Sequence, residues 1–81
     1  MDTLGMFCLK QRLSKGIELD EIGNCLNLTN TGVIELEAGR IEVKYDDLMK
    51  LGLVLRLNGK EFDQLHKIWV NQKKREMRNL K

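Results

Sequence analysis

Four positions that end or start helices divide this chain into five short segments with helical apolar spacing. Gly16, Asn27 and Gly39 each follow a run of apolar residues spaced three and four apart, and glycine or asparagine there favours the left-handed turn that ends a helix. Asn58 precedes Glu61 by three residues, which is the spacing of a capping box. Helices this short bury one apolar stripe each, so the pattern predicts a small all-helical core.

The same spacing predicts where the helices run. The first is expected to run from a cap at Asp2 or Thr3 to about Ser14, and the second to lie within residues 17–26. Thr29 is the expected N-cap of the third helix, the fourth covers residues 45–57, and the fifth opens at Asn58. The expected core cluster is Val33, Leu36, Leu48, Leu51 and Phe62, with Trp69 at the edge of the core or at an interface.

Length and composition bound the class of protein. The chain has 81 residues, no proline and few aromatic residues, which favours one helical domain over a β-sandwich. We expect an all-α domain over residues 1–81, with a core at about 3–70 and an extended C-terminal helix that ends in a basic tail at 71–81. No segment resembles a signal peptide or a membrane span, so a cytoplasmic protein without a membrane partner is expected.

The residues that carry chemistry predict no catalytic or metal site. Cys8 and Cys25 lie 17 residues apart and His66 is the one histidine, so no zinc-ligand spacing is present. The acids Glu35 and Glu37 stand two apart and point to different sides of a helix. We therefore expect no enzyme, cofactor or small-molecule substrate.

The net charge of +2 conceals a marked segregation of charge along the chain. Residues 1–16 carry a net charge of +2, from one acid and three bases. Residues 17–48 contain eight acids and two bases, a net charge of −6, whereas residues 49–81 contain nine bases and three acids, a net charge of +6. An anionic partner would therefore be attracted to the end of the chain and repelled by its middle.

Several short motifs, in order along the chain, carry a family resemblance. They are "LG" at 4–5, "DEIG" at 20–23, "LTNT" at 28–31, "IELEAG" at 34–39 and "YDDLMKLGLVL" at 45–55. In this order and spacing the chain resembles the Cro/CI-type (Xre) helix-turn-helix family of phage and plasmid repressors, over about residues 4–65. The resemblance implies a five-helix, lambda-repressor-like fold whose third helix reads DNA.

The resemblance also implies roles for individual residues. Relatives often pair an arginine of the first helix with a glutamate of the recognition helix, and Arg12 and Glu37 stand at those positions. Where relatives commonly begin the second helix with glutamine, this chain has Leu19. The implied face for DNA or another partner is Leu19, Thr29, Asn30, Thr31, Ile34, Glu35, Arg40 and Lys44.

Two functions compete for that face. The first is a small transcriptional regulator that binds a two-fold DNA site as a dimer, in which Asn30 would read adenine and Thr31 would contact phosphate or a thymine methyl. The second is a helix-turn-helix fold reused to bind a basic protein, such as another regulator or a polymerase subunit, because Glu35 and the acidic middle of the chain repel phosphate.

The basic end of the chain also has two interpretations. Lys73, Lys74, Arg75 and Arg78 would add phosphate contacts if the fifth helix reaches the duplex. The alternative is that these residues complement the C-terminal end of their own helix and keep the protein soluble. The resemblance further implies a homodimer formed through the C-terminal helix, to which Trp69 would contribute.

Overall fold

The computed structural model describes residues 3–79, with side chains described up to Glu76, and shows five helices in that range. They are α1 (Leu4–Lys15), α2 (Leu19–Leu26), α3 (Asn30–Glu37), α4 (Tyr45–Val54) and α5 (Gly59–Asn79). No strand occurs within these residues, which confirms the all-α expectation. None of the helices is both long enough and apolar enough to cross a membrane, among the residues described.

Side-chain caps and left-handed residues place the first three helices as expected. The Thr3 hydroxyl accepts a hydrogen bond from the amide of Met6, whereas Asp2, the alternative cap, lies outside the described residues. Gly16 and Asn27 end α1 and α2 with φ of 65° and 59°. Thr29 caps α3 by accepting from the amide of Gly32 at 3.1 Å. Local chemistry therefore determines these boundaries.

The junction between α4 and α5 differs from the expectation. Helix α4 ends at Val54, not near residue 57, because Arg56 adopts the left-handed region with φ of 53° and Leu57 donates its amide to the carbonyl of Gly52. Asn58 and Glu61 then form the predicted capping box, with reciprocal hydrogen bonds of 2.8 and 3.0 Å.

Helix α5 runs to Asn79 and so includes most of the stretch 71–81 that was expected to be a basic tail. It remains helical from Val70 to Asn79, and tertiary contacts hold this half. Gln72 accepts a hydrogen bond from the amide of Leu4 at 2.7 Å, and Lys73 forms an ion pair with Glu42 at 3.0 Å. These contacts join residues far apart along the chain, so helix propensity alone does not report them.

The core is apolar, and four of the five expected cluster residues are buried in it. Among the described residues none that is buried as a whole residue is polar or charged, and the largest side chains with at most 1% exposure are Ile22, Leu48, Leu51, Leu55, Leu65 and Val33. Leu36 is also buried, whereas Phe62 is only partly buried and packs against the cluster from outside. Burial of these side chains supplies most of the stability of so small a domain.

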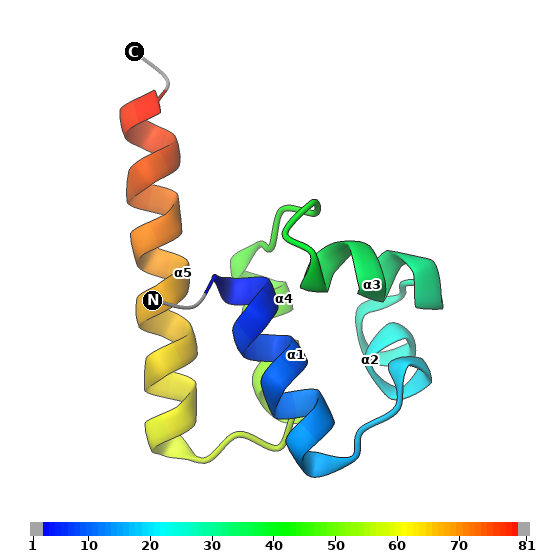
Figure 1. Ribbon diagram of the computed structural model, residues 1–81. Coiled ribbons are helices and arrows are strands. Elements are labelled where there is room, and N and C mark those ends of the chain that lie inside the picture. The colour runs from blue at the N-terminus through cyan, green and yellow to red at the C-terminus, as the bar shows by residue number, and fades with distance from the viewer. Residues whose placement is uncertain (1–2, 80–81) are drawn as a thin grey trace.

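Figure 1 shows α5 on one side of the molecule and α2 with α3 on the other, with α1 and α4 between them. Helix α2 packs against α3 and α4, and α1 packs against α3 and α5. A Cβ atom at Gly5 would overlap the backbone carbonyls of Leu36 and Glu37, so glycine lets α1 approach the end of α3 closely. This contact fixes α3 on the body of the protein.

Candidate functional site

The connection between α2 and α3 is three residues long and tightly held. Asn27 takes the left-handed conformation, the amide of Leu28 donates to the carbonyl of Gly23 at 2.8 Å, and Thr29 caps the next helix. The Leu28 side chain packs on the core. A Cβ at Gly23 would overlap the Leu28 carbonyl oxygen, so glycine allows this turn to close on α2. The two helices therefore form one rigid unit.

Helix α3 turns one side to the core and the other to solvent. Val33 and Leu36 are buried, with exposures of 0% and 4%. Thr29, Asn30 and Thr31 are exposed at the N-terminal end of the helix. The next exposed residue along the helix is Ile34, whose exposure is 52%. The outer face of α3 thus presents polar side chains at its start and an apolar one in its middle.

Glu37 is bound inside the molecule by Arg12. Arg12 Nε lies 2.7 Å from Glu37 Oε2, and Arg12 Nη2 lies 3.3 Å from Glu37 Oε1, so the pair is bidentate. The side chains of Arg12 and Glu37 are 14% and 7% exposed. A bidentate pair at this depth ties α1 to the end of α3 and removes the charge of Glu37 from the outer surface.

Glu35 forms a weaker ion pair at the surface. Its Oε1 lies 3.3 Å from Nη1 of Arg40, and the Arg40 side chain is 71% exposed. Sequence reasoning placed both residues on the candidate face but did not pair them, because they are five residues apart across the end of α3. An exposed pair of this kind contributes little to stability, yet it partly neutralises the one acid on the outer side of α3.

The remaining residues of the predicted face, Lys44 and Leu19, differ in how exposed they are. Lys44 is exposed in the loop that leads into α4. Leu19, the first residue of α2, is partly buried and packs against the core. Its place on the predicted face remains a prediction, and its partial burial follows because an apolar side chain gains more from packing on the core than from contact with water.

The basic end of α5 is partly engaged by the protein itself. Lys73 Nζ lies 3.0 Å from Glu42, 3.5 Å from Glu76, and 5.8 Å from the ring centroid of Trp69. The hydrogen bond between Lys73 and Glu42 raises the pKa of the lysine and lowers the pKa of the carboxyl. Trp69 donates Nε1–H to the carbonyl of Val43 at 2.7 Å. Both side chains anchor α5 to the loop after α3.

Other predicted tail contacts differ from Lys73. Lys74 and Arg75 are exposed and belong to no ion pair within the described residues. The Arg78 side chain lies outside the described residues. In Figure 1 this end of α5 projects past the start of α1, away from α3. Lys74 and Arg75 therefore do not add to the charge of the α3 face.

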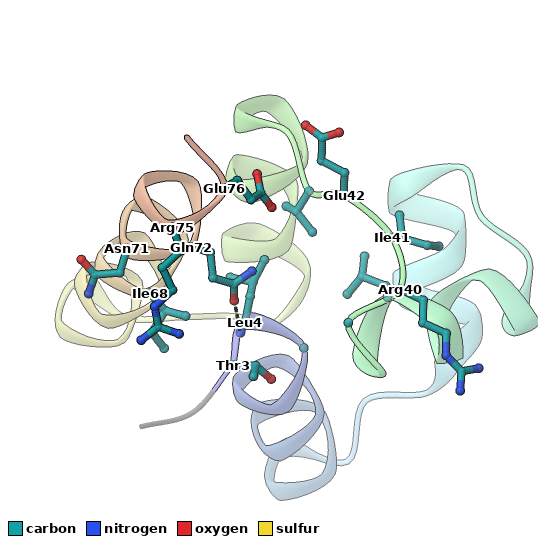
Figure 2. A pocket seen from close by; sticks show the side chains of 14 residues that line it. Thr3, Leu4, Arg40, Ile41, Glu42, Ile68, Asn71, Gln72, Arg75 and Glu76 are labelled. Carbon is teal, nitrogen blue, oxygen red and sulfur yellow. Dashed lines mark hydrogen bonds between the residues drawn. The ribbon is translucent and has the colours of Figure 1, made fainter. Parts of the chain in front are cut away.

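A hollow of about 430 Å³ lies between the start of α1, the loop after α3 and the second half of α5. Leu4, Ile41 and Ile68 contribute apolar walls. Figure 2 shows Arg40 extending away from α5, so its guanidinium is not directed into this hollow. The charged residues that line it are Glu42, Glu76, Arg40 and Arg75, and both acids form ion pairs with Lys73.

Reactive side chains are protected or dispersed in the described part of the chain. Burial and, to a lesser extent, the nearby Glu37 raise the pKa of the Cys8 thiol to about 12, so the thiol stays protonated near neutral pH. His66 lies between the rings of Phe62 and Trp69, at centroid distances of 6.5 and 6.2 Å. No cluster of three metal-binding side chains occurs among these residues.

Comparison of the chain with family models, with curated proteins and with solved structures finds no match. Inference about function therefore depends on the geometry of the protein itself.

Proposed function

We propose that α2 and α3 form a helix-turn-helix unit in a lambda-repressor-like domain, and that the protein is a small DNA-binding transcriptional regulator of the phage or mobile-element type, without catalytic activity. The observation that carries the proposal is the three-residue connection between α2 and α3, held by a left-handed Asn27 and an N-cap at Thr29. Two helices joined by a turn of this length are characteristic of the unit, in which the second helix enters the major groove.

The N-terminal end of α3 carries the chemistry that this role requires. Recognition helices contact base edges mainly through residues near their N-terminal ends. Asn30 and Thr31 are exposed there, and the Asn30 amide can form two hydrogen bonds with adenine. Arg40 and Lys44, exposed in the loop after α3, would contact the phosphate backbone.

The ion pairs described above reduce the electrostatic objection to this role. Glu37 is bonded to Arg12 below the surface and Glu35 is paired with Arg40 at its edge. When α3 docks, Arg40 would exchange Glu35 for a phosphate oxygen, leaving Glu35 close to the backbone of the duplex. Glu35 would then oppose binding, which keeps non-specific affinity low and makes the specific contacts decisive.

A second candidate function is favoured by the exposure of Ile34. An isoleucine that is 52% exposed at the centre of the α3 face, beside the single acid Glu35, would suit an apolar contact with another protein. In this role the helix-turn-helix fold would bind a basic protein surface, such as another regulator or a polymerase subunit. The two candidates predict opposite responses to a change of charge at Glu35.

Replacement of Glu35 by lysine tests the two functions. If α3 docks on DNA, Glu35→Lys should strengthen non-specific binding and steepen the slope of log affinity against log salt by about one unit, because one more phosphate is neutralised. If α3 meets a basic protein, the same change should weaken that complex. Fluorescence anisotropy with promoter DNA flanking the gene, measured across a salt series, gives the affinity and the slope.

A matched pair of variants separates position from total charge. Glu35→Gln and Gln64→Lys each raise the net charge by one, and Gln64 is an exposed residue of α5, the helix that lies across the molecule from α3 in Figure 1. Under the DNA-binding proposal Glu35→Gln should increase affinity more than Gln64→Lys. Absence of wild-type DNA binding even at low salt, or equal effects of the two variants, would contradict docking through α3.

A further inference from the structure

The solvent side of α5 is basic along most of its length. Between residues 60 and 75 the exposed positions recur three and four residues apart, so they lie along one side of the helix. Four of them are bases and one is an acid, which gives this side a net charge of +3. We call this surface the α5 face, and its members are Lys60, Asp63, Gln64, Lys67, Asn71, Lys74 and Arg75.

The bases of the α5 face are not compensated within the protein. None of the four belongs to an ion pair in the part of the chain that the structure describes. Lys73, which lies on the side of α5 turned towards the loop after α3, is instead paired with Glu42 and Glu76. The α5 face therefore presents positive charge that a partner of opposite sign can neutralise.

The chemistry of the α5 face fits a phosphate backbone better than a protein or a membrane. The centre of a protein interface is apolar, and a helix that lies on a membrane inserts apolar side chains. None of the exposed large apolar side chains among the described residues lies on α5. Phosphate oxygens need only cations and hydrogen-bond donors, and the amides of Gln64 and Asn71 add such donors between the lysines.

The face fits a duplex better than a single strand. Proteins that bind single strands stack the bases on aromatic side chains, but Phe62 and Trp69 of α5 pack against the core. Lys60, Lys67 and Lys74 are seven residues apart, so the row spans about 21 Å along the helix. Duplex DNA carries one charge per about 1.7 Å of its axis, so a row of this length meets several phosphates at once.

We propose that the α5 face binds the phosphate backbone of duplex DNA, apart from the contact proposed for α3. Figure 1 shows α5 across the molecule from α3, so a duplex on α3 leaves the α5 face open to a second segment. The choice of DNA rests on the function proposed above, whereas the charge of the face does not. With both faces occupied, one protein holds two duplex segments together.

The two faces differ in expected affinity, which allows each to be measured alone. Phosphate contacts without base contacts give dissociation constants of about 10⁻⁴ to 10⁻⁶ M, whereas specific sites reach about 10⁻⁸ M or below. Promoter DNA at nanomolar concentration therefore reports on α3, and a random-sequence duplex at micromolar concentration reports on the α5 face. Gln64→Lys should tighten binding of the random-sequence duplex and leave promoter binding almost unchanged.

Neutralisation of two lysines tests the α5 face. Fluorescence anisotropy of a random-sequence DNA duplex with the full chain, across a salt series, gives the affinity and the slope of log affinity against log salt. Lys67→Gln with Lys74→Gln should lower the magnitude of that slope by about two units and weaken binding at low salt by at least about tenfold. Lys67→Gln alone should lower it by about one unit, whereas the matched control Lys50→Gln, an exposed lysine on α4, should leave it unchanged.

A bridging measurement separates this proposal from the function proposed for α3. Beads that carry the promoter duplex should retain a second, labelled random-sequence duplex when the wild type is present, and the double lysine variant should abolish this retention. If α3 does not bind DNA, retention fails but the lysine-dependent anisotropy signal remains. Because the substituted side chains are exposed, circular dichroism melts of all variants should match the wild type.

Three results would overturn the proposal. The first is a wild type that does not bind the random-sequence duplex at low salt. The second is a double lysine variant that binds it as Lys50→Gln does. The third is tighter binding of the wild type to phosphatidylserine vesicles or to polyglutamate than to the duplex at the same salt, which would assign the α5 face to a membrane or to an acidic protein.

Discussion

The outer faces of α3 and α4 belong to helices that pack on the same core, but their charged residues differ in whether they form ion pairs within the chain. On α3, Glu37 is bonded to Arg12 and Glu35 to Arg40, so the acids of the helix are compensated within the chain. On α4, Asp46 and Lys50 are exposed without an ion pair in the described structure, next to three exposed apolar side chains. The α3 face therefore offers hydrogen-bonding groups on a rigid helix, whereas the α4 face offers apolar area with uncompensated charges.

This difference indicates different kinds of partner. A polar surface whose charged residues are already paired within the chain recognises a partner through directional hydrogen bonds, as in contact with base edges. An apolar stripe with free charges at its rim gains most from excluding water against another protein. Substitutions compared in pairs, or against the wild type, test this difference.

The largest effect is expected for leucine truncations. Leu36 on α3 is 4% exposed, and Leu36→Ala should lower the free energy of unfolding by about 2 to 5 kcal/mol, because it removes buried contacts and leaves a cavity. Leu53→Ala on α4, measured at low protein concentration, should change it by less than about 0.5 kcal/mol. Urea denaturation measures both. Equal losses from the two variants would show that the inner and outer sides of these helices are wrongly assigned.

A smaller effect is expected from two acids on α3 itself. Glu37→Ala leaves Arg12 unpaired at 14% exposure and should destabilise the fold by about 2 to 4 kcal/mol. Glu35→Ala breaks only the exposed pair with Arg40 and should cost about 0 to 1 kcal/mol. Thermal melts of the two variants at the same salt concentration give the comparison. If Glu35→Ala proves the more harmful, the compensation of charge described for α3 is incorrect.

The smallest change in stability is expected for Glu61, an acid of the first turn of α5 that belongs neither to the α3 face nor to the α4 face. The pKa of Glu61 is lowered from 4.5, first by the hydrogen bond from the Asn58 amide and then by the bond from Lys15. A lowered folded-state pKa means that this stabilisation is complete above pH 4.5 and is lost as pH falls through the lower folded value. The urea concentration at the unfolding midpoint should therefore decrease as the pH is lowered from 4.5, and it should decrease less steeply in Glu61→Gln. An identical pH dependence in the variant would assign the acid response to other carboxyls.

The sequence predicted those helix boundaries that are set by interactions between residues close together in the chain. The caps at Thr3 and Thr29, the left-handed residues Gly16 and Asn27, and the capping box at Asn58 involve groups within a few residues of each other. The end of α4 was missed because Arg56 is not a residue that favours the left-handed region, and the packing of Leu57 and Phe62 on the core decides that turn.

The candidate site shows the same division between local and long-range effects. The spacing of apolar residues by three and four places Val33 and Leu36 on the side of α3 that faces the core, and Asn30 and Ile34 on the side that faces solvent. The partial burial of Leu19 and the ion pairs Glu35–Arg40 and Lys73–Glu42 depend on how separate elements meet. None of these contacts has a fixed spacing along the chain, so no periodic pattern reports them.

The sequence by itself determined that this chain forms short helices around one apolar core, because caps, glycine and asparagine stops and apolar spacing act over a few residues. The tertiary structure alone decided how far α5 extends and which charges remain available to a partner. Helix extension at Gln72 and Lys73 depends on contacts with Leu4 and Glu42, more than thirty residues away along the chain. Charge compensation likewise depends on distances in space, since electrostatic and hydrogen-bond energies fall steeply with separation and exposure.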